Sequence, residues 1–141
     1  MATSPVPRTV GVERTSPARF TATNERGGRL AFGTGDGPDF TPTELFLAAV
    51  GGCTAIDVDI LTSRRAEPEA FAVAVEATKI RDEEGNRLTD IVVTFRVRFP
   101  IGPDGDAARE VLPGAVQRSH DRLCTVGRTV ELATPIATRV E

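Results

Sequence analysis

The pattern of apolar and polar residues near the start of the chain predicts short antiparallel strands. Between about residues 8 and 33, short segments rich in Val, Thr and Phe are separated by Ser16-Pro17 and by Gly27-Gly28. Such segments, bounded by turn residues, are typical of β-strands. We therefore expect two or three small strands in this region.

A long apolar helix is predicted next. Residues 41–44 have the form of a helix start: Thr41 can cap it, Pro42 suits the first helical position, and Glu44 can bond back to the cap as in a capping box. Residues 45–50 are apolar on all sides, which indicates a core helix enclosed on most faces. We expect this helix over about residues 42–65.

Two segments with period-two alternation follow, at about residues 71–80 and 88–99. This alternation is the pattern of half-buried strands, and the second segment is the clearest strand of the sequence. Apolar residues at helical spacing then indicate a second helix over about residues 105–123. Pro113 is expected to kink or divide that helix.

The end of the chain, residues 124–141, contains a cysteine segment and a predicted closing strand. Residues 124–131 fit a short helix or a turn, and residues 135–140 fit a strand. The full order is strands, helix, strand pair, helix and strand. This order predicts one α+β domain over residues 1–141, with antiparallel sheet packed on helices.

Composition excludes several function classes. The chain has 141 residues, a net charge of -3, and 5% aromatic residues, all of them Phe. Basic patches and stacking aromatics for nucleic acid are therefore lacking, and no nucleic-acid partner is expected. The sequence contains neither an apolar leader near Met1 nor about 18 consecutive uncharged apolar residues, so we expect no membrane partner and a cytoplasmic location.

The chemistry of the chain centres on its two cysteines, Cys53 and Cys124. In a reducing compartment they are either buried thiols or transient redox partners. Burial on the apolar helix favours the first interpretation for Cys53, because a buried thiol has a raised pKa. Reactivity requires an opposing group such as a guanidinium, and Arg14 and Arg19 on the early strands are the candidates.

His120, the only histidine, precedes Cys124 by four residues. A protonated imidazole there would favour the thiolate, but we favour a partly exposed residue that hydrogen-bonds near a helix end. A zinc site built from these residues and Cys53 lacks the usual paired-ligand spacing. A cysteine hydrolase lacks an identifiable oxyanion hole. We therefore expect neither a metal nor a cofactor.

Residues 40–58 (FTPTELFLAAVGGCTAIDV), followed much later by Cys124 in residues 119–126 (SHDRLCTV), resemble the OsmC/Ohr superfamily of osmotically inducible and organic-hydroperoxide-resistance proteins. The order of elements is similar over nearly the whole chain. The form Pro-x-Glu-Leu-x-x-x-Ala-x-x-Gly-Cys is more similar to the OsmC-like branch than to the Ohr branch.

The resemblance implies an intertwined homodimer with antiparallel sheets around long central helices and active sites at the subunit interface. It implies that Cys53 is the peroxidatic cysteine, Cys124 the resolving one, and that Arg19 activates the thiolate, with Arg14 in reserve. In the best-studied branches of the family a catalytic glutamate directly follows the helix-opening proline. Here the carboxylate is one position later, at Glu44, which is a site candidate with helix capping as the alternative.

The expected function is therefore a thiol peroxidase that acts in oxidative stress defence. Cys53 would become a sulfenic acid, Cys124 would resolve it as a disulfide, and an external dithiol would reduce that disulfide. An apolar lining that includes Val50 and Ile56 together with Phe46 would favour organic or lipid hydroperoxides. The alternative is a non-catalytic dimer that binds a small apolar ligand at the subunit interface.

Overall fold

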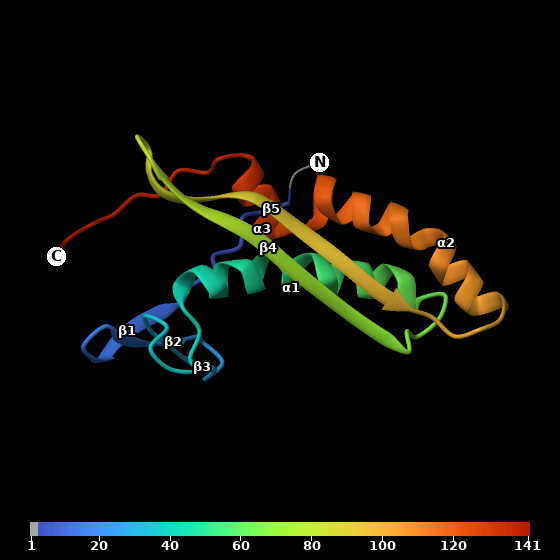
Figure 1. Cartoon of the computed structure of the whole chain (residues 1–141), viewed down its shortest axis with the longest axis horizontal. Coiled ribbons are helices and arrows are strands. Elements are labelled where there is room, and N and C mark those ends of the chain that lie inside the picture. Colours follow the sequence, from blue (N-terminus) through green and yellow to red (C-terminus); the bar gives the residue numbers. More distant parts are fainter. Residues whose placement is uncertain (1–2) are drawn as a thin grey trace. The chain divides into compact units, whose positions relative to one another are not determined.

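The structure is a computed structural model that describes residues 3–141, and its chain forms two compact units. The first unit extends to Phe46 and the second comprises Leu47–Glu141. Three strands, a long helix, a pair of strands and a group of helices follow one another along the chain (Figure 1), and the α+β class expected from the sequence is confirmed. Whether both units act as the single predicted domain stays a prediction.

The first unit contains a three-stranded antiparallel sheet. Strands β1 (Gly11–Ser16), β2 (Arg19–Thr23) and β3 (Arg29–Phe32) follow one another in the order β1-β2-β3. Phe20 and Phe32 are cross-strand partners whose stacked rings lie 6.1 Å apart. Such aromatic pairs contribute beyond the area they bury. The small strands predicted between residues 8 and 33 are therefore confirmed.

Helix α1 (Pro42–Ser63) begins in the first unit and continues in the second. Its start is the predicted capping box: the Thr41 amide donates to Glu44 Oε1 at 2.8 Å, and the Glu44 amide donates to Thr41 Oγ1 at 3.2 Å. Both amides belong to the set that a helix start leaves without intrahelical partners. The helix ends two residues before the expected position.

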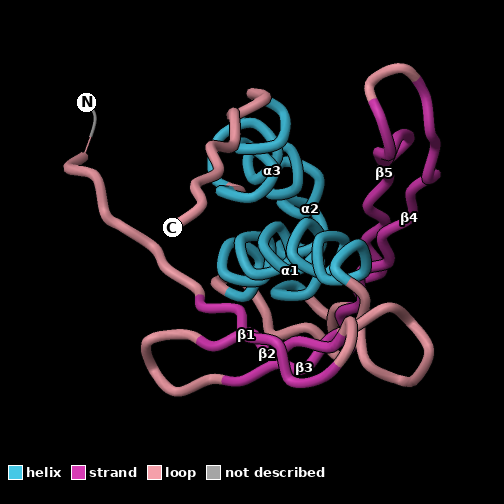
Figure 2. Tube along the Cα trace, turned by 90° about the vertical axis from the view of Figure 1, so that its left-hand side faces the viewer, coloured by secondary structure: helices cyan, strands magenta, loops and turns pink. Residues whose placement is uncertain are grey.

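Strands β4 (Ala70–Asp82) and β5 (Gly85–Arg98) form a long antiparallel hairpin in the second unit. Side chains alternate between half-buried and exposed along both strands, as the period-two pattern predicted. Phe71 and Phe95 meet edge to face on the inner side, with ring centroids 6.3 Å apart. Figure 2 shows the helices gathered on one side of this hairpin.

The C-terminal region has three helical segments: α2 (Pro103–Arg118), the π-helical turn η1 (Ser119–Leu123) and α3 (Thr125–Glu131). The expectation that Pro113 divides the second helix is wrong, because α2 is continuous through it. Proline leaves the carbonyl four residues earlier without its amide partner. That carbonyl belongs to exposed Arg109, where water can satisfy it.

The predicted closing strand over residues 135–140 is wrong, because residues 135–141 have no regular secondary structure. The alternating pattern alone does not make a strand, since a strand also needs a partner for its amide and carbonyl groups. Pro135 has no amide to offer, and Ile136 and Val140 are 90% and 100% exposed. The short helix allowed for residues 124–131 is confirmed as α3.

The expectation that α1 is enclosed on most faces is wrong for the single chain. Its buried residues lie on one face: Gly51, Thr54, Val58 and Thr62. Ile56 and Ile60 are 63% and 52% exposed. By length and composition α1 could also cross a membrane, a test that core helices of soluble proteins pass as well.

Glycine is unfavourable in the middle of a helix, so the Gly51-Gly52 pair of α1 indicates a close approach of another part of the chain, and the structure shows one at Gly51. A Cβ at Gly51 would lie 2.5 Å from Cγ2 of Val75 on β4, so the neighbour is a side chain. A Cβ at Gly52 would meet nothing within 4 Å. Gly51 therefore lets α1 pack against the hairpin, whereas Gly52 is not required for packing within the chain.

This difference predicts opposite effects of two matched substitutions. Gly51→Ala should lower the free energy of unfolding by about 1–3 kcal/mol, because the branched Val75 side chain has little freedom to move away. Gly52→Ala should raise it by up to about 1 kcal/mol, because alanine favours the helix. Urea denaturation of both variants tests this, and equal effects would contradict the packing described.

Candidate functional site

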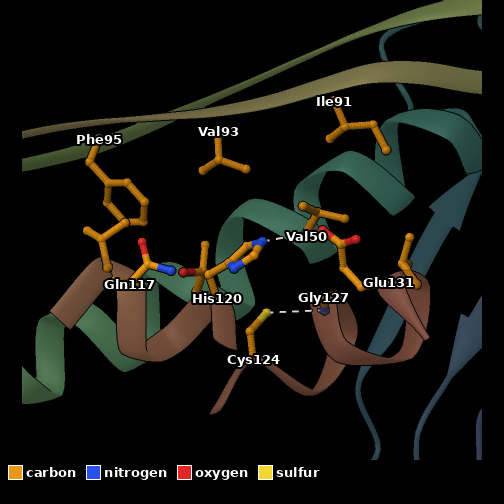
Figure 3. Close-up of a pocket in the computed structure, with 12 residues that line it drawn as sticks. Val50, Ile91, Val93, Phe95, Gln117, His120, Cys124, Gly127 and Glu131 are labelled. Carbon is orange, nitrogen blue, oxygen red and sulfur yellow. Dashed lines mark hydrogen bonds and ion pairs between the residues drawn. The ribbon is translucent and has the colours of Figure 1, made fainter. Parts of the chain in front are cut away.

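The second unit brings the two cysteines together. Cys53 lies half-buried on α1, and Cys124 lies between η1 and α3, where it is 3% exposed. Both thiols are free. The Cys124 sulfur occupies the cap position of α3 and accepts a hydrogen bond from the Gly127 amide at 3.2 Å (Figure 3).

The local backbone explains the position of Cys124. Its amide donates to the Ser119 carbonyl at 2.8 Å, a bond that spans five residues and closes the π-helical turn. Cys124 itself has an extended conformation, with φ -70° and ψ 100°, so the chain leaves one helical segment there and starts another. Short π-helical turns occur frequently at functional sites.

Burial raises the pKa of the Cys124 thiol above its ordinary value. The hydrogen bond from the Gly127 amide opposes this rise, whereas the neighbouring Cys53 thiol and the Asp57 carboxylate add to it. The first consequence is that Cys124 remains a protonated thiol at neutral pH. The second is that Cys53 lies close enough to influence the Cys124 pKa, as a dithiol pair requires.

A buried polar network joins α1 to η1, and sequence reasoning missed it. The hydroxyls of Thr54 and Ser119 are 2.7 Å apart, and Ser119 Oγ donates to Asp57 Oδ2 at 2.9 Å. Thr54 directly follows Cys53 in the sequence, and Asp57 lies one turn further along α1. The signal that was available is the charge of Asp57 on a largely apolar helix, because a partly buried carboxylate needs a hydrogen-bond partner.

A cavity of about 410 Å³ lies beside Cys124 (Figure 3). Strand β5 contributes Ile91, Val93 and Phe95, and polar groups come from Gln117 and His120. The complete lining is as follows: Val50, Thr54, Ile91, Val93, Phe95, Val116, Gln117, His120, Cys124, Gly127, Val130 and Glu131. The cavity therefore combines an apolar wall with a thiol.

The predicted lining of this region needs correction. Val50 lines the cavity as expected, but Ile56 is 63% exposed. Phe46 belongs to the first unit. The apolar wall comes instead from β5, since alternate residues of a strand point to one side and the inner residues of this hairpin face the helices. Helical periodicity alone could not identify those contacts.

His120 lies at the surface and hydrogen-bonds near a helix end, as the favoured interpretation predicted. Its Nδ1 lies 2.9 Å from Asp121 Oδ1 and its Nε2 lies 3.3 Å from Glu131 Oε1. Hydrogen bonds from Asp121 and then Glu131 raise the His120 pKa above 6.5. Carboxylates only accept hydrogen bonds, so an imidazolium that donates from both nitrogens fits this geometry.

The remaining predicted site residues lie in the first unit. Arg14 on β1 and Arg19 at the start of β2 both have exposed side chains in the single chain. Glu44 is engaged in the capping box with Thr41. The catalytic roles of these residues stay predictions. Among residues 3–141, the structure contains no group of three or more His, Cys, Asp or Glu side chains placed to hold a metal ion.

The fold and the site together define a small α+β protein with one thiol, Cys124, beside an apolar cavity and a second thiol, Cys53, near the first. Residues 33–139 match the family profile described as OsmC-like protein. The chain therefore belongs to the OsmC-like family.

Known relatives agree with this assignment. An uncharacterized protein of Mycobacterium tuberculosis is 28% identical over 127 residues, which cover 89% of this chain and 90% of the relative. A solved OsmC-like protein of Vibrio cholerae superposes with a TM-score of 0.73 at 14% identity, covering 89% of this chain and 94% of that chain. An organic hydroperoxide resistance protein OsmC of Legionella pneumophila superposes with a TM-score of 0.60 at 14% identity, covering 91% of each chain. At these identities the two structures establish the fold alone.

The surroundings of His120 predict its titration. Its pKa should lie above 6.5, so the stabilisation from its charged form is complete below that pH and is lost as the pH rises through the His120 pKa. Glu131→Gln should lower this pKa, because the imidazolium loses a carboxylate partner. NMR titration of this single histidine measures both values.

Glu110→Gln provides the matched control, because Glu110 is not among the groups that shift the His120 pKa. It should leave the titration of His120 unchanged. A His120 pKa at or below 6.5 in the unsubstituted protein would contradict the described contacts.

Proposed function

We propose that this protein is a thiol peroxidase that reduces organic hydroperoxides, with Cys53 as the attacking residue and Cys124 as the resolving residue. The observation that carries this proposal is that the second unit holds two free thiols close to each other, which differ in how far they are buried. Cys124 is nearly inaccessible and has a raised pKa, whereas Cys53 is only half-buried. The more accessible thiol suits peroxide attack. The buried one is shielded from peroxide in solvent and can react only with a neighbouring group, as a resolving cysteine does.

The proposed reaction needs only these two sulfurs and an external reductant. The Cys53 thiol gives up its proton, and the thiolate attacks the terminal peroxide oxygen. The O–O bond breaks, Cys53 becomes a sulfenic acid, and the alkoxide takes up the released proton and leaves as the alcohol. The Cys124 sulfur then attacks Cys53, the S–O bond breaks, and water leaves as the disulfide forms. An external dithiol supplies two electrons and two protons to restore both thiols.

The apolar cavity supports a preference for organic over inorganic peroxide. It adjoins Cys124 and presents Val93 and Phe95 from β5. Burial of a substrate's alkyl part contributes about 0.8 kcal/mol per methylene, so a bound hydrocarbon group would strengthen binding. A role in oxidative stress defence, exercised in the cytoplasm, is part of the proposal.

The proposal includes a homodimer and an activating arginine. Ile56 and Ile60 leave an apolar strip of α1 exposed in the single chain, and a second copy of the chain would cover it. A nearby positive charge favours the thiolate form of a cysteine in general. Arg19 is the first candidate for such a group at this site, with Arg14 in reserve.

A non-catalytic binding protein is the second candidate function. The same cavity supports it, because a largely apolar wall with a few polar groups suits a small apolar ligand. In that case both cysteines are packing residues. The two candidates differ in what happens to the thiols when peroxide is added.

Thiol counting after peroxide treatment tests the proposed activity. The reduced protein, treated with one equivalent of cumene hydroperoxide, should lose both thiols and two hydrogens in mass, with cumyl alcohol as the product. Cys53→Ser should consume no peroxide, since the attacking sulfur is absent. Cys124→Ser should stop at a Cys53 sulfenic acid that dimedone traps.

Two results would contradict the proposal. If both thiols persist under conditions in which a known thiol peroxidase turns over, the binding function is favoured. If Cys53→Ser still consumes peroxide, the assignment of roles to the two cysteines is wrong.

Glu44 provides a separate prediction that distinguishes capping from catalysis. Glu44→Ala should lower the free energy of unfolding by about 0.5–2 kcal/mol, because the Thr41 amide loses its partner. Glu44→Gln keeps an acceptor oxygen and should restore most of that loss. A purely capping residue leaves peroxide consumption by Glu44→Gln unchanged, whereas a loss of activity with normal stability would show a catalytic carboxylate.

A further inference from the structure

One buried side chain connects the two cysteine-bearing elements. Ser119 is fully buried, and its hydroxyl contacts Thr54 at 2.7 Å and Asp57 at 2.9 Å, both on α1. Its carbonyl accepts the amide of Cys124 at 2.8 Å. The same residue therefore bonds to the helix that carries Cys53 through its side chain and to Cys124 through its backbone.

The direction of the hydrogen bonds makes the connection specific. A serine hydroxyl has one proton, and Ser119 donates it to the Asp57 carboxylate. The hydroxyl of Thr54 must then be the donor to Ser119 Oγ. The hydrogen bonds therefore run in one direction, from Thr54 to Ser119 and from Ser119 to Asp57. Within residues 3–141, no buried side-chain polar atom lacks a hydrogen-bond partner.

We propose that Ser119 is a positioning residue for disulfide formation between Cys53 and Cys124, held by Thr54 and Asp57. This inference rests on the function proposed above and assigns the residues that make its second step fast. Ser119 holds the start of the π-helical turn against α1, and Cys124 is the residue at which that turn ends. The bonds of Ser119 therefore set the position of Cys124 relative to the helix that carries Cys53.

The chemistry of that step explains why positioning matters. The Cys124 sulfur attacks the Cys53 sulfenic acid, the S–S bond forms, the S–O bond breaks, and hydroxide leaves with the Cys124 proton as water. A disulfide requires the two Cα atoms to lie about 4.4–6.8 Å apart. Holding the two sulfurs in such an arrangement raises their effective concentration relative to each other, and this speeds the reaction between them.

Ser119→Ala is the direct test, because it removes one oxygen and both side-chain bonds to α1. Disulfide formation after peroxide addition should slow by about tenfold or more, the scale expected for two lost hydrogen bonds, and dimedone should now trap the Cys53 sulfenic acid. The rate of Cys53 oxidation should stay within about twofold, because α1 keeps its own helical bonds. Disulfide formation at the original rate would overturn the proposal.

An isosteric pair covers the case in which Ser119→Ala fails to fold. Thr54→Val keeps the shape of the side chain but removes its donor to Ser119, and it should slow disulfide formation by about threefold to tenfold. Thr62→Val is the matched control: Thr62 is also buried on α1, but its hydroxyl bonds only within the helix, to the Val58 carbonyl at 2.9 Å. Thr54→Ser restores the hydroxyl and should restore the rate. Equal slowing by Thr54→Val and Thr62→Val would show a purely structural effect.

A measurement without peroxide separates this inference from the proposed activity. Equilibration of each variant with glutathione buffers reports how well Cys53 and Cys124 are placed to form a disulfide, whatever their biological oxidant. Thr54→Val should lower that equilibrium constant by about threefold to tenfold relative to Thr62→Val. If the shift is seen but peroxide is not consumed, the proposed activity fails while the positioning role stands. If peroxide is consumed but no shift is seen, the positioning role fails.

Discussion

The arrangement of the two cysteine-bearing elements depends on one buried hydrogen bond, from the Ser119 hydroxyl to the Asp57 carboxylate. Asp57 brings a charge onto an apolar helix, and a charge in such surroundings is costly unless it is hydrogen-bonded. Ser119 provides that bond at 2.9 Å and is itself fully buried. Because the Ser119 carbonyl also accepts the Cys124 amide, the residue that bonds to the carboxylate of α1 also joins the helix that carries Cys53 to the turn that ends at Cys124.

This constraint also explains why the two thiols differ. Cys124 follows the π-helical turn into the interior, where burial and the nearby Asp57 carboxylate raise its pKa. Cys53 is only half-buried, and the helix that carries it also has exposed apolar residues, Ile56 and Ile60. One sulfur is thus held protonated in the interior, and the other is more open to reactants.

Local sequence patterns predicted much of the fold, because strands, helices and capping boxes depend on neighbouring residues. The Thr41 and Glu44 capping box and the hairpin of β4 and β5 are examples. The patterns failed where the outcome depends on distant contacts: residues 135–140 alternate like a strand but have no strand conformation. The bond between Ser119 and Asp57 joins residues 62 positions apart, so no local pattern could have predicted it. The resemblance to the family named both cysteines in advance, but it did not identify what holds them together.

The most direct test of the central claim is the mapping of disulfides in the protein after mild oxidation at low protein concentration. The account predicts that the peptide containing Cys53 is joined to the peptide containing Cys124 of the same chain, and that the product runs as a monomer on a denaturing, non-reducing gel. Free thiols at both positions, or disulfides only between different chains, would contradict it.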